Sequence, residues 1–406
     1  MNFQIRPIAD AELEAFSKCQ AVSFGLDFRP EEVEPRRKVM ELERSLAVFD
    51  GEQIVGTAGV FSYRMSVPGG ELPTAGVTMV SVRPTHRRRG ILTEMMRRQL
   101  DDVRDRGEPL AALWASESQI YGRFGYGLAA EGVDLRIERA RAGFASPTAL
   151  RGRTRQVDAD EARESWPSIW EAVRQGQPGM MPRSDNWWSG RIFRDPESRR
   201  GGFTANVYVN YEVDGELHGY VRYRMKAGYE LGLPAGTLSV EELIATTDDA
   251  YAALWQYVFG VDLVATIEAP WRKVDEPLYW MLSDPRRLVR HPHDSLWVRV
   301  VDVPGALEGR AYRAEGAVTF RVRDPFCAWV AGVYRLECGH GGASCRRVEA
   351  TPDFELGAAD LGACYLGGTR FAALARAGRV NGDASAIARA DAMFAWDPLP
   401  WCPEIF

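Results

Sequence analysis

The chain has 406 residues, with 50 basic and 56 acidic side chains and a formal net charge of −6. At roughly 100 to 200 residues per domain, this length predicts two to four domains, each with a core of its own. The small negative balance argues against a general nucleic-acid-binding role, which needs a basic excess or patch, and no run reaches the roughly 18 apolar residues that a membrane-spanning helix needs.

The N-terminal and cysteine patterns bear on the compartment. Residues 1–16 carry acidic side chains early and lack the apolar stretch of a secretory signal. The six cysteines are scattered and too few to cross-link a chain of 406 residues. We therefore expect a protein of the reducing cytoplasm.

The first third of the chain predicts a strand meander, then a helix, then a strand. Residues 45–67 hold two β-rich runs around Asp50-Gly51, which is a strong hairpin signal. A third strand is expected over 76–84. A helix that opens near residue 91 and ends at Gly107 precedes a buried strand over 110–115. Its expected apolar face consists of Ile91, Leu92, Met95, Met96, Leu100 and Val103.

The middle of the chain repeats this order. Residues 141–166 are polar, which predicts a domain boundary near residue 150. A hairpin with Asp214-Gly215 at its turn, a strand over 236–245, a helix over 246–259 and a strand over 261–269 then follow. We interpret this segment as a diverged duplicate of the first. Its tryptophan-rich stretch 185–193 predicts core packing, with a ligand cage as the alternative.

The last third predicts a separate α+β unit. Short strands are expected within 296–351, and helices within 355–380. The chain ends in an unusually apolar and aromatic tail, and termini fray unless something ties them down. We therefore expect Trp401, Ile405 and Phe406 to be buried.

Two short histidine-containing motifs could suggest a metal. Cys338, His340 and Cys345 do not have the spacing of a zinc knuckle and lack a second pair of ligands, so a glycine-rich turn is expected there instead. His291 and His293 are expected in a linker. We therefore predict no metal site.

The most informative stretch is residues 85–100, where three arginines and a glycine precede the first predicted helix. The first N–H groups of a helix lack internal partners, and the helix dipole is positive there. Arg87 and Arg88 would add charge, and Gly90 would let the backbone approach a ligand closely. These features suit a phosphate or pyrophosphate, whereas the second copy carries Asp248 and Asp249 at the matching position. A merely solvated arginine turn is the alternative.

Two motifs then resemble known families. Residues 80–92, VSVRPTHRRRGIL, resemble the acyl-CoA loop of the GNAT acetyltransferases, although Leu92 stands where Gly or Ala is usual. Residues 112–129, ALWASESQIYGRFGYGLA, resemble the Eis (enhanced intracellular survival) family of N-acetyltransferases. The resemblance implies an α+β fold of two GNAT-type domains, the second degenerate, and a sterol-carrier-like domain. We expect these domains over residues 1–150, 151–294 and 295–406, in a homo-hexamer.

The resemblance also implies a reaction and a site. It implies acetyl-CoA as the cosubstrate and amines of polycationic small molecules, aminoglycosides above all, as acceptors. Arg87, Arg88, Gly90 and Ile91 would hold the pyrophosphate. Val80 and Val82 would pair with the pantetheine, and a bulge there would aim an N–H at the thioester oxygen. Simple strand core is the alternative for both valines. Ser116 would contact the coenzyme, but with Gln119 it also has the spacing of a capping box.

By the same resemblance, Tyr121 is the general acid that protonates the thiolate of coenzyme A, and Tyr126 is packing. A phenol with a pKa of about 10 is protonated at neutral pH, as an acid must be. The resemblance makes the C-terminal carboxylate, here on Phe406, the base, and burial would raise its pKa. The same carboxylate could instead anchor a cationic amine.

The acceptor side has weaker signals. Asp27, Met79 and Glu404 are candidate substrate contacts, although Met79 could equally be a core residue of its strand. The penultimate residue, often acidic in the family, is Ile405 here. Acetylation of lysine in a peptide or protein is the alternative enzymatic function. A non-catalytic acyl-CoA- or lipid-binding scaffold is the alternative of another class.

Overall fold

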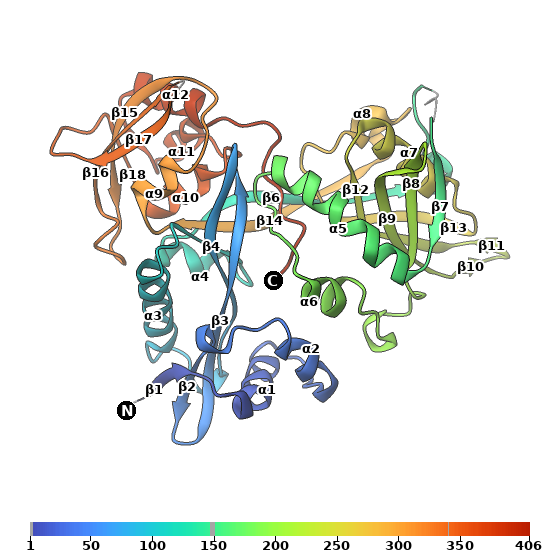
Figure 1. The fold of residues 1–406 in the computed structure, drawn as a ribbon, viewed down its shortest axis with the longest axis horizontal. Coiled ribbons are helices and arrows are strands. Elements are labelled where there is room, and N and C mark those ends of the chain that lie inside the picture. Colours follow the sequence, from blue (N-terminus) through green and yellow to red (C-terminus); the bar gives the residue numbers. More distant parts are fainter. Residues whose placement is uncertain (1–2, 147–150, 340) are drawn as a thin grey trace. The chain divides into compact units, whose positions relative to one another are not determined.

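The computed structural model describes residues 3–146, 151–339 and 341–406. It divides into two compact units (Figure 1). Unit 1 contains Met1–Ala130, Pro178–Met181 and Asp294–Phe406, and unit 2 contains Glu131–Gln177 and Pro182–His293. The predicted boundary near residue 150 falls beside residues 147–150, which lie outside the described residues.

The first sheet of unit 1 has the strand order β1-β2-β3-β4-β5-β14. Its strands are β1 (Gln4–Pro7), β2 (Leu46–Asp50), β3 (Gln53–Val67), β4 (Gly70–Val82), β5 (Leu110–Trp114) and β14 (Val289–Val300), of which β14 enters this unit at Asp294. The predicted hairpin at Asp50-Gly51 is confirmed. β4 runs antiparallel to β3 and parallel to β5, and its pairing with β5 ends at Val77, before the end of β4.

Helix α3 (Ile91–Asp105) follows β4, as the sequence predicted. Its buried face contains the expected Ile91, Met95, Met96, Leu100 and Val103, while Leu92 is only half-buried. Gln99 is buried as well, and its side chain donates a hydrogen bond of 3.1 Å to the carbonyl of Gly59. The other helices of this part are α1 (Leu13–Ser23), α2 (Val33–Arg37) and α4 (Ser118–Tyr121).

The C-terminal part of unit 1 has a five-stranded sheet in the order β17-β16-β15-β18-β19. Its strands are β15 (Gly316–Arg323), β16 (Gly332–Gly339), β17 (Gly342–Arg347), β18 (Phe354–Gly357) and β19 (Asn381–Gly382). Its helices are α9 (Val303–Glu308), α10 (Ala358–Tyr365), α11 (Phe371–Arg376) and α12 (Ala384–Phe394). The helices expected within 355–380 are confirmed. The strands expected after residue 312 are found as β15, β16 and β17, but the expectation of strand over residues 303–308 is wrong, because these residues form α9 with Pro304 in its first turn.

Unit 2 contains a sheet in the order β6-β13-β12-β9-β8-β7. The strands are β6 (Gly127–Glu138), which enters this unit at Glu131, β7 (Arg153–Val157), β8 (Val207–Val213), β9 (Glu216–Lys226), β12 (Gly236–Ala245) and β13 (Val264–Arg272). A separate hairpin joins β10 (Tyr229–Glu230) to β11 (Leu233–Pro234). The helices are α5 (Ala159–Gly176), α6 (Asp185–Trp187), α7 (Asp248–Gly260) and α8 (Leu278–Met281).

The predicted repeat of strand order is visible in unit 2. The hairpin at Asp214-Gly215 joins β8 to β9, and β12 runs antiparallel to β9 and parallel to β13. This is the arrangement of β4 between β3 and β5. The tryptophan-rich stretch is core, since Trp187 and Trp188 are 5% and 3% exposed.

The two histidine motifs lie in regular structure. His291 and His293 belong to β14, so the linker expectation was wrong. Cys338 and Cys345 lie in paired strands, β16 and β17, while His340 is outside the described residues. Within the described ranges, no group of three or more His, Cys, Asp or Glu side chains could hold a metal ion.

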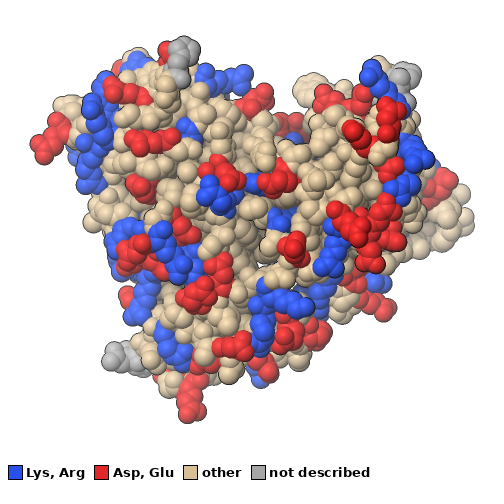
Figure 2. All heavy atoms as spheres, in the orientation of Figure 1, with Lys and Arg blue, Asp and Glu red and all other residues tan. Residues whose placement is uncertain are grey.

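The charge is mixed on the face drawn in Figure 2, where blue and red side chains alternate over the surface. Interspersed signs of this kind give no single extended field that would attract a large polyanion. Among the described residues, no helix is long and apolar enough to cross a membrane.

Candidate active site

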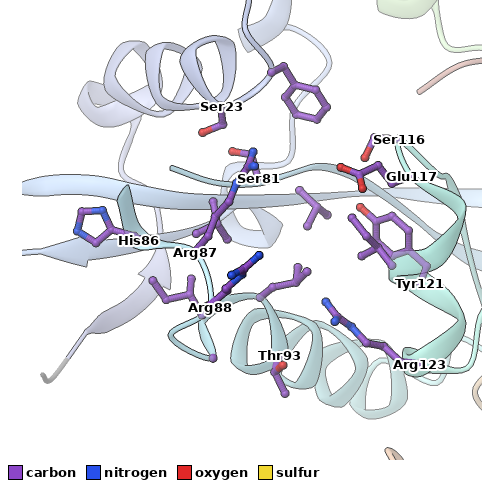
Figure 3. Close-up of a pocket in the computed structure, with 17 residues that line it drawn as sticks. Ser23, Ser81, His86, Arg87, Arg88, Thr93, Ser116, Glu117, Tyr121 and Arg123 are labelled. Carbon is purple, nitrogen blue, oxygen red and sulfur yellow. The ribbon is translucent and has the colours of Figure 1, made fainter. Parts of the chain in front are cut away.

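A cavity of about 630 Å³ lies in unit 1, against the end of β4, the start of α3 and helix α4. It is within the size range of about 300 to 1,000 Å³ that small-molecule sites have. Figure 3 shows Arg87 and Arg88 on one side and Tyr121, with Arg123 near it, on the other. Eight residues expected to bind coenzyme or act on it line this cavity: Val80, Val82, Arg87, Arg88, Gly90, Ile91, Ser116 and Tyr121.

The basic side of the cavity is the start of α3. Gly90 is the N-cap residue, in the left-handed region at φ 81°, and no side chain caps this helix end. A Cβ at Gly90 would meet nothing within 4 Å, so the backbone there is open to a ligand. Arg87 and Arg88 are exposed and line the cavity. The uncapped N–H groups, the dipole and the two guanidinium groups together favour an anion.

A β-bulge interrupts the strand pairing next to the cavity. Thr57 pairs with Ser81 and Gly59 with Thr78, so Met79 and Val80 together face Ala58. Met79 has a φ of 52°, and its carbonyl accepts a hydrogen bond of 2.7 Å from the Thr57 hydroxyl. A bulge leaves part of the ladder unpaired and redirects the local backbone groups. On its other edge, β4 pairs with β5 only over Thr74–Val77, so among the described residues the part of that edge from Thr78 to Val82 is left without a partner strand beside the cavity.

Tyr121 is the last residue of α4 and is 5% exposed. Burial raises the pKa of its phenol to about 12, a hydrogen bond with Ser116 opposes that rise, and the charge of Glu117 adds to it. In Figure 3 the Tyr121 hydroxyl is directed toward Ser116 and Glu117. The phenol therefore keeps its proton at neutral pH and presents it at the cavity wall.

Tyr126 has a different environment. It is completely buried, its hydroxyl has no hydrogen-bond partner among the described residues, and its ring packs edge-on against that of Tyr121 at 6.2 Å. It does not line the cavity. These contacts are those of a packing residue.

The capping box expected at Ser116 is absent. The N-cap of α4 is Glu117, without a side-chain hydrogen bond, and the Ser116 hydroxyl interacts with Tyr121 instead. The predicted end of this segment is confirmed, because Gly125 has a φ of 83° after the 3-10 turn Gly122–Phe124.

Four predicted residues lie outside the lining of this cavity. Asp27 is exposed in the loop after α1. Met79 packs against the core cluster around Leu13 and Phe16. Glu404 is 6% exposed, and Phe406 is 8% exposed. Met79 nevertheless precedes Val80 in the bulge, so it adjoins the cavity through the backbone.

The C-terminal tail is held on the same sheet. The Phe406 ring lies 5.4 Å from the ring of Tyr63 on β3. A Cβ at Gly76 of β4 would lie 2.5 Å from the Tyr63 ring and 3.3 Å from the Phe406 ring, so this glycine makes room chiefly for Tyr63, on which Phe406 packs. Trp401 and Phe406 are buried as predicted, but Ile405 is 43% exposed, contrary to the expectation.

Comparisons with known proteins identify domain families and relatives that resemble this chain. Two acetyltransferase (GNAT) domain profiles match residues 4–129 and 179–300, and a sterol carrier protein domain profile matches residues 303–403. An uncharacterized N-acetyltransferase of Streptomyces avermitilis is 43% identical over 94% of both chains. N-acetyltransferase Eis of Mycobacterium tuberculosis is 36% identical over 93% of both chains. The crystal structure of Eis1 from Mycobacterium abscessus superposes with a TM-score of 0.86, at 33% identity, over 99% of this chain and 100% of that one.

The chain belongs to the Eis family of N-acetyltransferases. Its fold is therefore two GNAT domains followed by a sterol-carrier-like domain, as the sequence predicted. The exact boundaries at residues 150 and 294 stay predictions.

The second GNAT domain of this Eis-family protein differs at its helix start. Thr247 caps α7 by accepting a hydrogen bond from the Ala250 N–H, and Asp248 and Asp249 occupy the first turn. Carboxylates there satisfy and neutralise the helix end and would repel a phosphate. The uncapped start with neighbouring arginines is thus found at α3, whereas α7 has a capped and acidic start.

Sequence reasoning missed part of the cavity wall. Ser23 and Phe24 come from the end of α1, and Glu117, Ile120 and Arg123 from the segment around α4. The sequence could have indicated Glu117, because it lies between the predicted site residues Ser116 and Tyr121. Ser23 and Phe24 had none, since only the folded chain brings α1 near α3.

Proposed function

We propose that this Eis-family protein transfers the acetyl group of acetyl-CoA to amines of polycationic small molecules, with aminoglycosides acetylated at several positions. The observation that carries the proposal is one cavity with a basic helix start at one end and a protonated tyrosine at the other. Acyl transfer from a phosphate-bearing thioester requires an anion site for the nucleotide and an acid that protonates the leaving thiolate.

The residues present fit acetyl-CoA. The open space at Gly90 and the exposed Arg87 and Arg88 suit its pyrophosphate, and the bulged edge at Val80 suits its amide-containing arm. Bound there, acetyl-CoA supplies the activated acetyl group. Holding it in one orientation is itself a large part of catalysis, because it makes the acyl transfer effectively unimolecular.

Proton movements complete the proposed mechanism. The amine attacks the thioester carbon, the backbone N–H groups of the bulge stabilise the developing oxyanion, and Tyr121 gives its proton to the departing thiolate. The carboxylate of Phe406 accepts the proton that the amine loses. Asp27 and Glu404 are proposed to attract the ammonium groups of the acceptor, which opposite charge favours.

The deciding experiment measures free thiol released from acetyl-CoA in the presence of aminoglycosides, polyamines and lysine-containing peptides. We expect the aminoglycosides to react fastest and mass spectrometry to find more than one acetyl group per molecule. Acetylation of peptides alone would favour the lysine acetyltransferase alternative, and no thiol release with any amine would contradict the proposed activity.

Hexamer formation stays a prediction that analytical ultracentrifugation can test.

A further inference from the structure

A four-residue segment, Pro178–Met181, belongs to unit 1 although the sequence on both sides of it belongs to unit 2. On one side it pairs with β3. The Gly179 N–H donates to the Ser66 carbonyl at 2.8 Å, and the Ser66 N–H donates to the Met180 carbonyl at 2.9 Å. β2 pairs with β3 only as far as Ala58, so the edge of β3 beyond that point is open to this segment.

On its other side the segment holds the C-terminal tail. The Trp401 N–H donates a hydrogen bond of 2.8 Å to the Pro178 carbonyl. Gly179 has a φ of 95°, and a Cβ there would lie 2.9 Å from the Trp401 oxygen and 3.2 Å from its carbonyl carbon. Only glycine permits both this backbone conformation and this approach.

The tail continues from this contact to the sheet of the active site. Cys402 is 1% exposed, and its carbonyl accepts a hydrogen bond of 3.3 Å from the Ser295 hydroxyl. The chain then ends with the Phe406 ring on Tyr63. Tyr63 and Ser66 both lie on β3. The tail is therefore attached to this strand at two places, through Pro178–Met181 at Ser66 and directly at Tyr63.

We propose that Pro178–Met181 is a clamp for the C-terminal tail and that Gly179 is a positioning residue for the terminal carboxylate. A tail of a few residues, fixed at Trp401, can reach only a small volume, so the clamp restricts where its last atoms lie. The consequence for turnover rests on the proposed function, whereas the clamp itself does not.

The test compares Gly179→Ala with Gly201→Ala in the full chain. Gly201 also has a positive φ, of 58°, but a Cβ there meets nothing within 4 Å, so this control carries the backbone strain without the contact. The readout is the alkylation rate of Cys402, measured by mass spectrometry of the intact fold. Cys364, buried and free, is the internal reference for global unfolding.

We expect Gly179→Ala to raise the alkylation rate of Cys402 by about tenfold or more relative to Cys364, because local release of the tail exposes it. Gly201→Ala should leave the ratio unchanged. An unchanged ratio in Gly179→Ala overturns the clamp. If that variant does not fold, hydrogen exchange of the wild type decides: a tail peptide 399–406 that exchanges as fast as an unstructured peptide overturns it too.

Measurements of kcat distinguish the clamp from the proposed role of the Phe406 carboxylate as a base. We expect Gly179→Ala to lower kcat about tenfold or more with an unchanged KM for acetyl-CoA. In a chain that ends at Cys402, where the Phe406 carboxylate is missing, the same substitution should have little further effect on kcat. If Cys402 becomes reactive while kcat is unchanged, the clamp stands and the positioning role is overturned. If a residue appended after Phe406 leaves activity intact, the proposed base fails, but the labelling result still supports the clamp.

Discussion

At the scale of single residues, Tyr121 and Tyr126 carry the same phenol in different surroundings, and we propose that only Tyr121 acts as an acid. Tyr121 reaches the cavity and has Ser116 and Glu117 beside its hydroxyl. Tyr126 is enclosed, and its hydroxyl is without a partner. An acid must touch the reacting atoms, so exposure to the cavity and not residue type distinguishes the two.

Removing the Tyr121 hydroxyl tests this assignment. We expect Tyr121→Phe to lower kcat by about 10²- to 10⁴-fold, the usual contribution of a general acid, with acetyl-CoA affinity unchanged by calorimetry. Tyr126→Phe is the matched control and should change kcat less than about twofold, since its hydroxyl makes no bond to lose. Equal activity of the two variants would remove Tyr121 from the mechanism.

The pKa of Tyr121 gives a pH prediction. A pKa of about 12 keeps the phenol protonated through pH 10, so kcat should show no alkaline decline from this group below that pH. Glu117 raises this pKa through its charge. Glu117→Gln removes that charge and should therefore lower the pKa, bringing tyrosinate and the alkaline decline to lower pH.

The absorbance of tyrosinate is titrated in each protein. Subtracting the titration of Tyr121→Phe leaves the signal of Tyr121 and gives the shift in its pKa. Glu117→Asp keeps the charge and should stay close to the wild type. A Tyr121 pKa that rises in Glu117→Gln would contradict the electrostatic account.

At the scale of elements, we propose that α3 combines a structural and a binding role on different parts of one helix. Its apolar face anchors it in the core, and its uncapped start opens onto the cavity. Substitutions at the start should therefore change ligand binding without unfolding the helix, because the buried face is untouched.

Charge reversal at Arg87 and Arg88 tests this separation. We expect the double variant Arg87→Glu/Arg88→Glu to raise the KM for acetyl-CoA by about 10²-fold or more, since hydrogen bonds to charged groups contribute about 1.5 to 3 kcal/mol each. The thermal midpoint should change little. Arg136→Glu/Arg141→Glu, a matched reversal at exposed residues outside the cavity, should leave KM unchanged. Calorimetry showing equal acetyl-CoA affinity in both double variants would mean that α3 does not hold the coenzyme.

At the scale of the whole molecule, unit 1 gathers the two ends of the sequence. The first GNAT domain supplies the cavity, and the last residues of the chain return to β3 and β4 of the same sheet. A proposed catalytic group at the chain's end depends on this return, because a free terminus would be solvated and mobile.

Extending the chain tests the terminal base. We expect one glycine appended after Phe406 to lower kcat by about 10²-fold, because the carboxylate is displaced from the position that a base requires. Acetyl-CoA affinity should be unchanged, and a glycine added before Met1 is the control. Full activity in the C-terminally extended protein would rule out the carboxylate as the base.

Much of the fold was readable from local pattern. The turns at Asp50-Gly51 and Asp214-Gly215 and the apolar face of α3 each depend on a few adjacent residues, and all three were predicted. Eight of the predicted residues line one cavity: six lie on the contiguous strand, loop and helix start from Val80 to Ile91, and Ser116 and Tyr121 come from the motif around α4.

Several expectations from local pattern were wrong. The sequence suggested that Ser116 would cap α4, whereas its hydroxyl interacts with Tyr121. It suggested a linker at His291, which lies in a strand, and a buried Ile405, which is exposed. For Ser116 a tertiary neighbour decided the outcome, and local propensity is a weak guide once tertiary contacts compete with it.

By itself, then, the sequence determined the elements, the family and the chemistry of the helix start, because these follow from short-range periodicity and from motifs of adjacent residues. Only the tertiary structure decided which tyrosine reaches the cavity, that Glu117 joins it, and that Gly179 lies against Trp401. Contacts of this kind join residues far apart in the chain, and they depend on how backbones approach in space, which no local pattern records.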